Sequence, residues 1–154
     1  MDQMKEQVIR KAIVGLISHD IAMLNHTKAR QHSKALRYFN STPTRELFAK
    51  LMTHARLTDH SYSVSDIADL LSISHLSALR MVNDSEEEGW IDSTRGKHGR
   101  RLCKGTLVLE DMSYDWLKIV FEEAERLKLG AVWRALEVLE DLQEDEQSLT
   151  SKPS

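Results

Sequence analysis

The sequence contains few of the residues that cross-link or interrupt a chain. Its 154 residues include one cysteine, two prolines and six glycines. The single thiol, Cys103, excludes an intramolecular disulfide and a zinc site of four cysteines, and it is typical of a protein kept in a reducing cytoplasm. Because helix breakers are rare and 29% of the residues are charged, the composition predicts a mainly α-helical protein.

Long apolar runs are absent as well. No run approaches the roughly 20 residues of a membrane-spanning helix, and residues 1–10 lack the apolar stretch of a signal peptide. We therefore expect a cytoplasmic protein without a membrane partner. Hydrophobic residues still make up 41% of the chain, which is enough for a core and argues against a disordered protein.

The net charge of −3 conceals an uneven distribution along the chain. Residues 1–62 carry ten Lys or Arg against five Asp or Glu, residues 63–108 carry six against seven, and residues 109–154 carry five against twelve. The acidic average is therefore compatible with a nucleic-acid partner, because recognition depends on the local charge of the binding surface.

Helical periodicity dominates both ends of the chain. Apolar residues from Ile9 to Leu24 recur every three or four positions, which predicts a long helix. A helix of about 35 residues would be over 50 Å long, so this segment either breaks around 31–33 or packs against a second chain. A loop then precedes a helix for which Thr44 is the expected N-cap. Apolar stripes predict further helices from Asp111 onward.

Two short helices joined by a three-residue turn are predicted in the middle of the chain. Ser63 or Ser65 caps the first helix, and Ser74 caps the second after a turn at 72–74. Gly89 suits the end of the second helix, because glycine adopts a positive φ at little cost. The pattern predicts a helix-turn-helix.

A β-hairpin with a basic tip is expected next. Residues 90–94 predict one strand, and Leu102 together with 106–109 predicts the return strand. Residues 93–104 contain five cations and no acid, namely Arg95, Lys97, Arg100, Arg101 and Lys104. A phosphate backbone is the natural partner of such a tip, although an exposed charge run can also be no more than a solvated hairpin.

The sequence resembles the MarR family of bacterial transcription regulators. The resemblance lies in the helix-turn-helix at 64–82 and in residues 88–91, where the hairpin begins. The resemblance implies a mainly α fold with a small β-hairpin wing, in which a winged helix-turn-helix is flanked by long dimerisation helices. The implied function is that of a dimeric regulator that binds specific sequences of double-stranded DNA. The expected divisions are N-terminal dimerisation helices at 1–40, the winged helix-turn-helix at 44–109, C-terminal dimerisation helices at 110–146 and a flexible tail at 147–154.

The resemblance also assigns roles to individual residues. The recognition helix would meet the major groove, and the wing would hold the backbone or the minor groove, while Ala78, Met81 and Val82 would face the core. The residues expected at DNA are His75, Leu76, Ser77, Leu79, Arg80, Arg95, Lys97, Arg100 and Arg101. The residues expected in the dimer interface are Ile9, Ile13, Leu16, Leu136, Leu139 and Leu142. A pocket for a small-molecule effector is possible in this family, and Trp116, Tyr114 and His54 are candidates to line it.

Two other functions are alternatives to DNA binding: binding of another protein, and catalysis. The acidic run at 84–88 would also suit a winged helix that binds another protein and touches DNA weakly or not at all. An enzyme has no support, because no phosphate loop, nucleophile elbow or zinc-protease motif is present. We expect neither a metal nor a cofactor, since His19 and His26 would lie about 10 Å apart on one helix, too far to share a zinc ion. Cys103 is better explained as a small buried residue than as a redox sensor.

Overall fold

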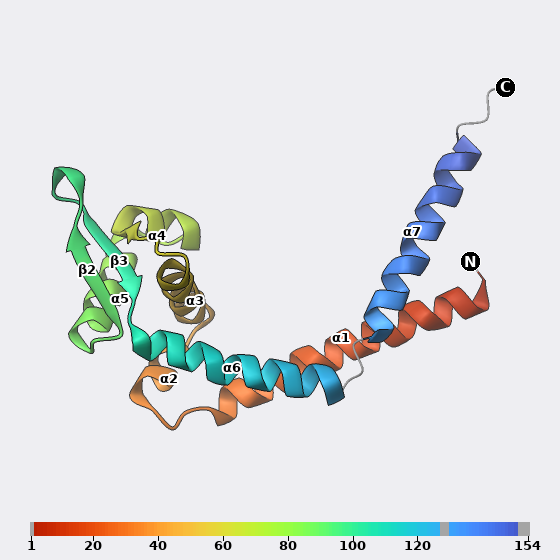
Figure 1. The fold of residues 1–154 in the computed structure, drawn as a ribbon, viewed down its shortest axis with the longest axis horizontal. Coiled ribbons are helices and arrows are strands. Elements are labelled where there is room, and N and C mark those ends of the chain that lie inside the picture. Colours follow the sequence, from red (N-terminus) through yellow and green to blue (C-terminus); the bar gives the residue numbers. More distant parts are fainter. Residues whose placement is uncertain (1, 127–129, 151–154) are drawn as a thin grey trace. The chain divides into compact units, whose positions relative to one another are not determined.

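The computed structural model describes residues 2–126 and 130–150, and it is mainly helical with one small sheet (Figure 1). This confirms the predicted fold class. The elements are α1 (Gln3–Ala29), α2 (Lys34–Phe39), α3 (Pro43–Leu57), β1 (Tyr62–Ser63), α4 (Val64–Leu71), α5 (His75–Glu87), β2 (Ile91–Arg95), the 3-10 turn η1 (Lys97–Gly99), β3 (Arg101–Gly105), α6 (Leu107–Arg126) and α7 (Gly130–Thr150).

The chain divides into two compact units. One comprises residues 27–118 and holds the helix-turn-helix and the hairpin, and the other comprises the described residues before and after this range. The predicted break in the N-terminal segment is confirmed, because α1 ends at Ala29 and α2 begins at Lys34. Of the predicted tail, residues 147–150 belong to α7, and 151–154 lie outside the described residues.

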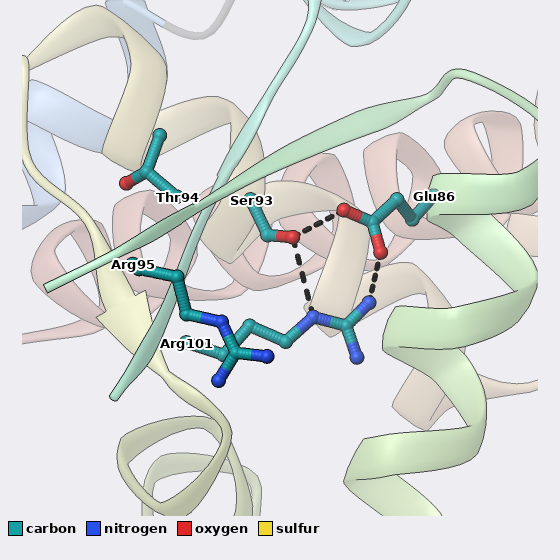
Figure 2. Close-up of a pocket in the computed structure, with 5 residues that line it drawn as sticks. All are labelled: Glu86, Ser93, Thr94, Arg95 and Arg101. Atoms are coloured by element: carbon teal, nitrogen blue, oxygen red, sulfur yellow. Dashed lines mark hydrogen bonds and ion pairs between the residues drawn. The ribbon is translucent and has the colours of Figure 1, made fainter. Parts of the chain in front are cut away.

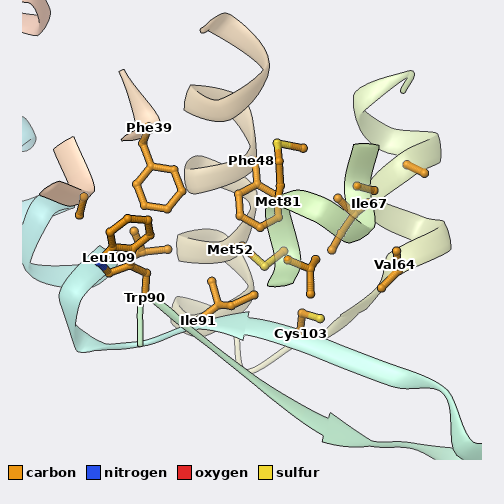
Figure 3. Close-up of a cluster of buried hydrophobic side chains, with 14 residues drawn as sticks. Phe39, Phe48, Met52, Val64, Ile67, Met81, Trp90, Ile91, Cys103 and Leu109 are labelled. Carbon is orange, nitrogen blue, oxygen red and sulfur yellow. The ribbon is translucent and has the colours of Figure 1, made fainter. Parts of the chain in front are cut away.

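The core of the 27–118 unit lies between α2, α3, α4, α5 and the sheet (Figure 3). Phe48 and Met52 stand one helical turn apart on α3 and are completely buried. Phe39 of α2 packs edge-on against Trp90, with ring centroids 5.1 Å apart. Because buried side chains come from every one of these elements, the helix-turn-helix and the hairpin share a single core with α2 and α3.

Side-chain caps set where the helices of this unit begin. The hydroxyl of Ser63 accepts a hydrogen bond from the Asp66 backbone N–H (3.1 Å), and the Asp66 carboxylate accepts one from the Ser63 N–H (2.9 Å). Ser63 is therefore the cap of α4, which resolves the choice between Ser63 and Ser65. These hydrogen bonds lower the pKa of the Asp66 carboxylate. The prediction of Thr44 as a cap was wrong: Thr42 caps α3, because Pro43 can occupy the first helical position without losing a hydrogen bond.

The sheet has the strand order β1-β3-β2, with both pairs antiparallel. The prediction of a return strand through 106–109 was wrong, because β3 ends at Gly105 and α6 begins at Leu107 rather than near Asp111. Thr106 ends the strand: its hydroxyl donates to the backbone carbonyl of Gly89 (2.9 Å), and its carbonyl accepts from the N–H of Glu110 (3.3 Å) in the first turn of α6. The apolar run supplies Leu109, which is fully buried, to the inner face of a helix.

The second unit consists of helical segments that leave much apolar surface uncovered. On α1, Ile13, Ile17 and Ile21 are each at least half exposed. Within the described part of this unit, Ala12 and Ala135 are the buried apolar residues. The imidazole of His26 lies 2.9 Å from the Glu123 carboxylate and lowers its pKa, with Arg126 contributing to the same effect.

Along residues 2–126 and 130–150, no helix combines the length and the hydropathy that crossing a membrane requires.

Candidate nucleic-acid interface

Helix α5 presents its N-terminal half to solvent. The hydroxyl of Ser74 caps it by accepting a hydrogen bond from the Ser77 N–H (3.1 Å). The predicted inward residues are confirmed, since Ala78, Met81 and Val82 are buried. The residues exposed along the outer face of this half are His75, Leu76, Ser77 and Arg80.

Leu79 differs from the other residues expected at DNA. It is half-buried and packs against the core, so less of its side chain is open to a partner. Arg80 is exposed, and within the described residues it has no ion pair. Asp84 stands one helical turn after Arg80, but its carboxylate accepts a hydrogen bond from the Tyr38 hydroxyl (3.1 Å).

The wing is formed by β2, η1 and β3. Its tip closes through a hydrogen bond from the Gly96 N–H to the Arg100 carbonyl (2.7 Å), and Arg95 donates to the Gly99 carbonyl (3.0 Å). His98 and Gly99 both have positive φ, which a glycine tolerates and which turns the chain sharply. This turn leaves Arg95, Lys97 and Arg100 exposed, and none of the three has an ion pair among the described residues.

The other two wing cations each have a carboxylate partner within the unit. Arg101 forms an ion pair with Glu86 of α5 and donates hydrogen bonds to Asn83 (2.7 Å) and Ser93 (3.2 Å) (Figure 2). Lys104 lies 3.3 Å from Asp59. Of the five cations that the sequence placed in the wing, three are therefore available to an external anion.

The acidic run at 84–88 is largely occupied by contacts within the unit. Asp84 is bonded to Tyr38, Glu86 to Arg101, and Glu88 to Lys34. Burial and the neighbouring Asp84 raise the pKa of Tyr38 to about 12. Ser85 is fully buried. Sequence reasoning missed these pairings, because each joins α5 to an element distant in the chain.

The wing and helix α5 meet at a hollow of about 270 Å³. His75 from α5 lines it with Arg100 and Arg101 from the wing and with the serines at the start of α4, although the Arg101 guanidinium is already bonded to Glu86, Ser93 and Asn83. Arg100 also reaches the Ser63 hydroxyl (3.4 Å). An imidazole, a guanidinium and hydroxyls converge here, and all three groups can donate hydrogen bonds to an anionic oxygen.

A second, more apolar cavity of about 320 Å³ is lined by residues of α2, α3 and α6. Phe39, Leu109 and Trp116 form apolar walls, while Arg30 and His54 supply polar groups. Two of the three candidate pocket residues, His54 and Trp116, line it. The third, Tyr114, instead donates a hydrogen bond to Glu110 (3.1 Å) and does not line the cavity.

Cys103 is completely buried in the sheet. Burial raises the pKa of its thiol to about 11, so the reactive thiolate is scarce at neutral pH. This agrees with its interpretation as a small core residue. Among the described residues, no group of His, Cys, Asp and Glu is arranged to hold a metal ion.

Comparison with known proteins identifies the fold. No family model and no curated protein matches the sequence. Solved structures do match: MepR, a transcription regulator of the Staphylococcus aureus multidrug efflux pump MepA, superposes with a TM-score of 0.57 at 17% identity, covering 89% of this chain and 96% of that one. The Thermotoga maritima transcriptional regulator Tm0710 gives 0.53 at 16% identity, covering 78% and 86%.

A third match covers nearly the whole chain. The multiple antibiotic-resistance repressor (MarR) of Listeria monocytogenes gives a TM-score of 0.52 at 15% identity, covering 99% of this chain and 98% of that one. These proteins are described as transcription regulators, and their likeness extends over the flanking helices as well as the hairpin. The chain therefore has the winged helix-turn-helix fold of the MarR-like transcription regulators.

Proposed function

We propose that this protein is a dimeric transcription regulator that binds specific sequences of double-stranded DNA. One observation carries the proposal: His75 of the recognition helix and Arg100 of the wing line the same hollow. A groove-reading helix and a phosphate-binding wing must act on one duplex, and the fact that both elements line one hollow supports this arrangement. The fold shared with known transcription regulators supports it.

The exposed side chains divide between two tasks. On α5, Arg80 is suited to pair bidentately with guanine, His75 and Ser77 can hydrogen-bond to base edges, and Leu76 can contact a thymine methyl. On the wing, Arg95, Lys97 and Arg100 would bind the backbone or enter the minor groove. Base contacts specify a sequence, whereas phosphate contacts position the protein on any duplex.

The second unit is proposed to form the dimer. Its helices expose Ile13 and Leu16 on α1 and Leu136 and Leu139 on α7, each at least two-fifths exposed. Apolar stripes of this extent are unfavourable in water, and an identical chain is the simplest partner that would cover them. Two recognition helices related by a twofold axis would then read half-sites about 34–36 Å apart.

The apolar cavity supports a small-molecule effector as part of this function. Its walls suit an aromatic ring, and Arg30 and His54 could hold an anionic substituent. Titration with small aromatic carboxylates, followed by tryptophan fluorescence, tests this directly because Trp116 lines the cavity. A Trp116→Phe variant should lose the fluorescence change, which separates this site from Trp90 and Trp133.

The experiment that tests the main proposal is selection of DNA sequences by the full-length protein, followed by gel shift at two salt concentrations. We expect a motif with two symmetry-related halves and an affinity that falls steeply with salt. If the protein selects no motif and binds no DNA at low salt, the alternative of a protein-binding winged helix replaces the proposal. The internal pairing of Asp84, Glu86 and Glu88 disfavours that alternative, because it occupies the acidic surface on which it depends.

A further inference from the structure

We infer that Arg101 is a positioning residue that fastens the wing to the recognition helix, and that it does not contact DNA. This inference rests on the proposed function and changes the role that the sequence analysis gave to Arg101. It concerns a closed cluster of three side chains, Glu86, Ser93 and Arg101, which we call the wing brace (Figure 2).

The brace joins three elements by mutually dependent hydrogen bonds. Arg101 on β3 forms an ion pair with Glu86 on α5, and its Nε donates to the hydroxyl of Ser93 on β2 (3.2 Å). The Ser93 hydroxyl in turn donates to the second oxygen of the Glu86 carboxylate. The other nitrogens of the guanidinium fork are also used, since Nη1 donates to Asn83 Oδ1 (2.7 Å).

The environment of Arg101 differs from that of its neighbour Arg100. The Arg101 side chain is only 26% exposed, and its charge is compensated by a carboxylate. The hydrogen bond from Ser93 and the charge of Arg101 both lower the pKa of Glu86, so the pair stays ionised at neutral pH. A cation that is already paired with a carboxylate displaces few of the counterions condensed on DNA. Arg100 is exposed and has no ion pair among the described residues, so its contact with a phosphate should release about one counterion.

Fastening matters because both DNA-binding elements must be placed together. The brace adds polar bonds between the hairpin and the C-terminal half of α5. If the wing moved independently, only a fraction of molecules would present helix and wing in the arrangement that fits one duplex. The apparent dissociation constant rises in proportion as that fraction falls.

The decisive test is whether Glu86→Gln tightens or weakens DNA binding. If Glu86 acts on DNA only through its charge, Glu86→Gln removes a repulsive carboxylate and tightens binding. If Glu86 belongs to a brace, the same variant weakens binding, by about three- to tenfold. Ser93→Ala sharpens the test, because it removes a hydroxyl of the brace without changing any charge and should also weaken binding. Thr94→Ala is the matched control, since the Thr94 side chain is exposed and has no hydrogen bond among the described residues.

Salt dependence separates positioning from contact. Arg100→Gln should make the log–log salt slope of DNA binding shallower by about 2 for a dimer, while Arg101→Gln should weaken binding and leave the slope unchanged. Exchanging the charges, Glu86→Arg with Arg101→Glu, should recover part of the affinity that either single change loses. The inference is overturned if Glu86→Gln tightens binding, if Ser93→Ala behaves like Thr94→Ala, or if Arg101→Gln changes the slope as much as Arg100→Gln.

The mobility of the wing tests the brace without DNA, and so it applies even if the protein does not bind DNA. Backbone ¹⁵N relaxation of residues 96–100 should show lower order parameters in Glu86→Gln and Ser93→Ala than in the wild type and Thr94→Ala. Unchanged order parameters in both brace variants would overturn the inference whatever the protein binds. Failure of the wild type to bind any DNA, with the order parameters lowered as expected, would contradict the proposed function alone.

Discussion

The hydroxyl of Tyr38 on α2 donates a hydrogen bond to the Asp84 carboxylate on α5, at 3.1 Å. This bond ties the recognition helix to an element outside the helix-turn-helix. Together with Lys34–Glu88 and Arg101–Glu86 it secures the C-terminal half of α5 at three points, while the N-terminal half stays exposed. The half that we propose to read DNA is thus free, and the acidic half is held within the unit.

Burial of Tyr38, together with its hydrogen bond to Asp84, makes the free energy of unfolding fall at alkaline pH. The pKa of Tyr38 is raised to about 12 in the folded protein, above its ordinary value of 10.0. Its stabilising effect is therefore complete below pH 10 and lost as the pH rises toward 12. We expect Tyr38→Phe to cost about 0.5–1.5 kcal/mol in denaturant unfolding at pH 8 and to flatten the decline between pH 9 and 11. A decline that is as steep in Tyr38→Phe as in the wild type would refute the expectation.

Arg80 is expected to read a base. Arg80→Ala should cost about 1–3 kcal/mol per half-site on the selected motif and relax the preference at one base pair, with little effect on non-specific DNA. Arg80→Lys keeps the charge but not the bidentate fork, so it should relax the preference while affecting non-specific binding even less. Repeating the selection of DNA sequences with each variant measures the change in base preference. An unchanged motif in both would show that Arg80 is not a reader.

The exposed wing cations are expected to carry the salt dependence. Lys97→Gln with Arg100→Gln removes four phosphate contacts from a dimer, so the log–log salt slope should become shallower by about 3–4. Binding should weaken by a similar factor on all sequences, because phosphate contacts carry no sequence information. Fluorescence anisotropy on the selected site and on a scrambled duplex tests both points. A wing that is merely solvated would leave the slope at the wild-type value.

The second unit is expected to hold the dimer together. Sedimentation of the full chain should give a dimer at micromolar concentration, and Leu139→Glu should shift it toward a 17.7 kDa monomer by placing a charge in the interface. Leu47→Glu is the matched control, because Leu47 is similarly exposed but lies on α3 in the other unit. A wild type that sediments as a monomer, or two variants that behave alike, would count against the proposed interface.

The start of α3 offers a test of local structure. Thr42→Ala removes the hydroxyl that accepts from the Arg45 N–H (3.2 Å) and should lower the free energy of unfolding by about 1 kcal/mol. Thr44→Ala, at the position that the sequence alone suggested, should change it much less. Thermal or denaturant unfolding of the two variants compares them directly, and the reverse order would indicate that α3 begins at Thr44.

Local patterns in the sequence predicted the helix-turn-helix, the hairpin that follows it and the helices on either side, but not β1 or the start of α6. Apolar spacing predicted the long terminal helices, the cap at Ser74 and the exit at Gly89 were found as expected, and Ser63 is one of the two caps proposed for α4. These features depend on residues within a few positions of one another, and a sequence displays such relationships directly. The resemblance to MarR-like regulators rested on the same short-range order.

Tertiary structure alone decided how distant side chains are paired and what the apolar run after the wing becomes. Leu107–Leu109 has the composition of a strand, but packing Leu109 into the core and pairing Thr106 with the carbonyl of Gly89 turns the segment into the start of α6. Arg101 and Arg100 are adjacent and alike in sequence, yet one is paired with Glu86 and the other is exposed. A charge pattern states how many cations a segment carries; which of them remain available depends on the partners that folding brings beside them.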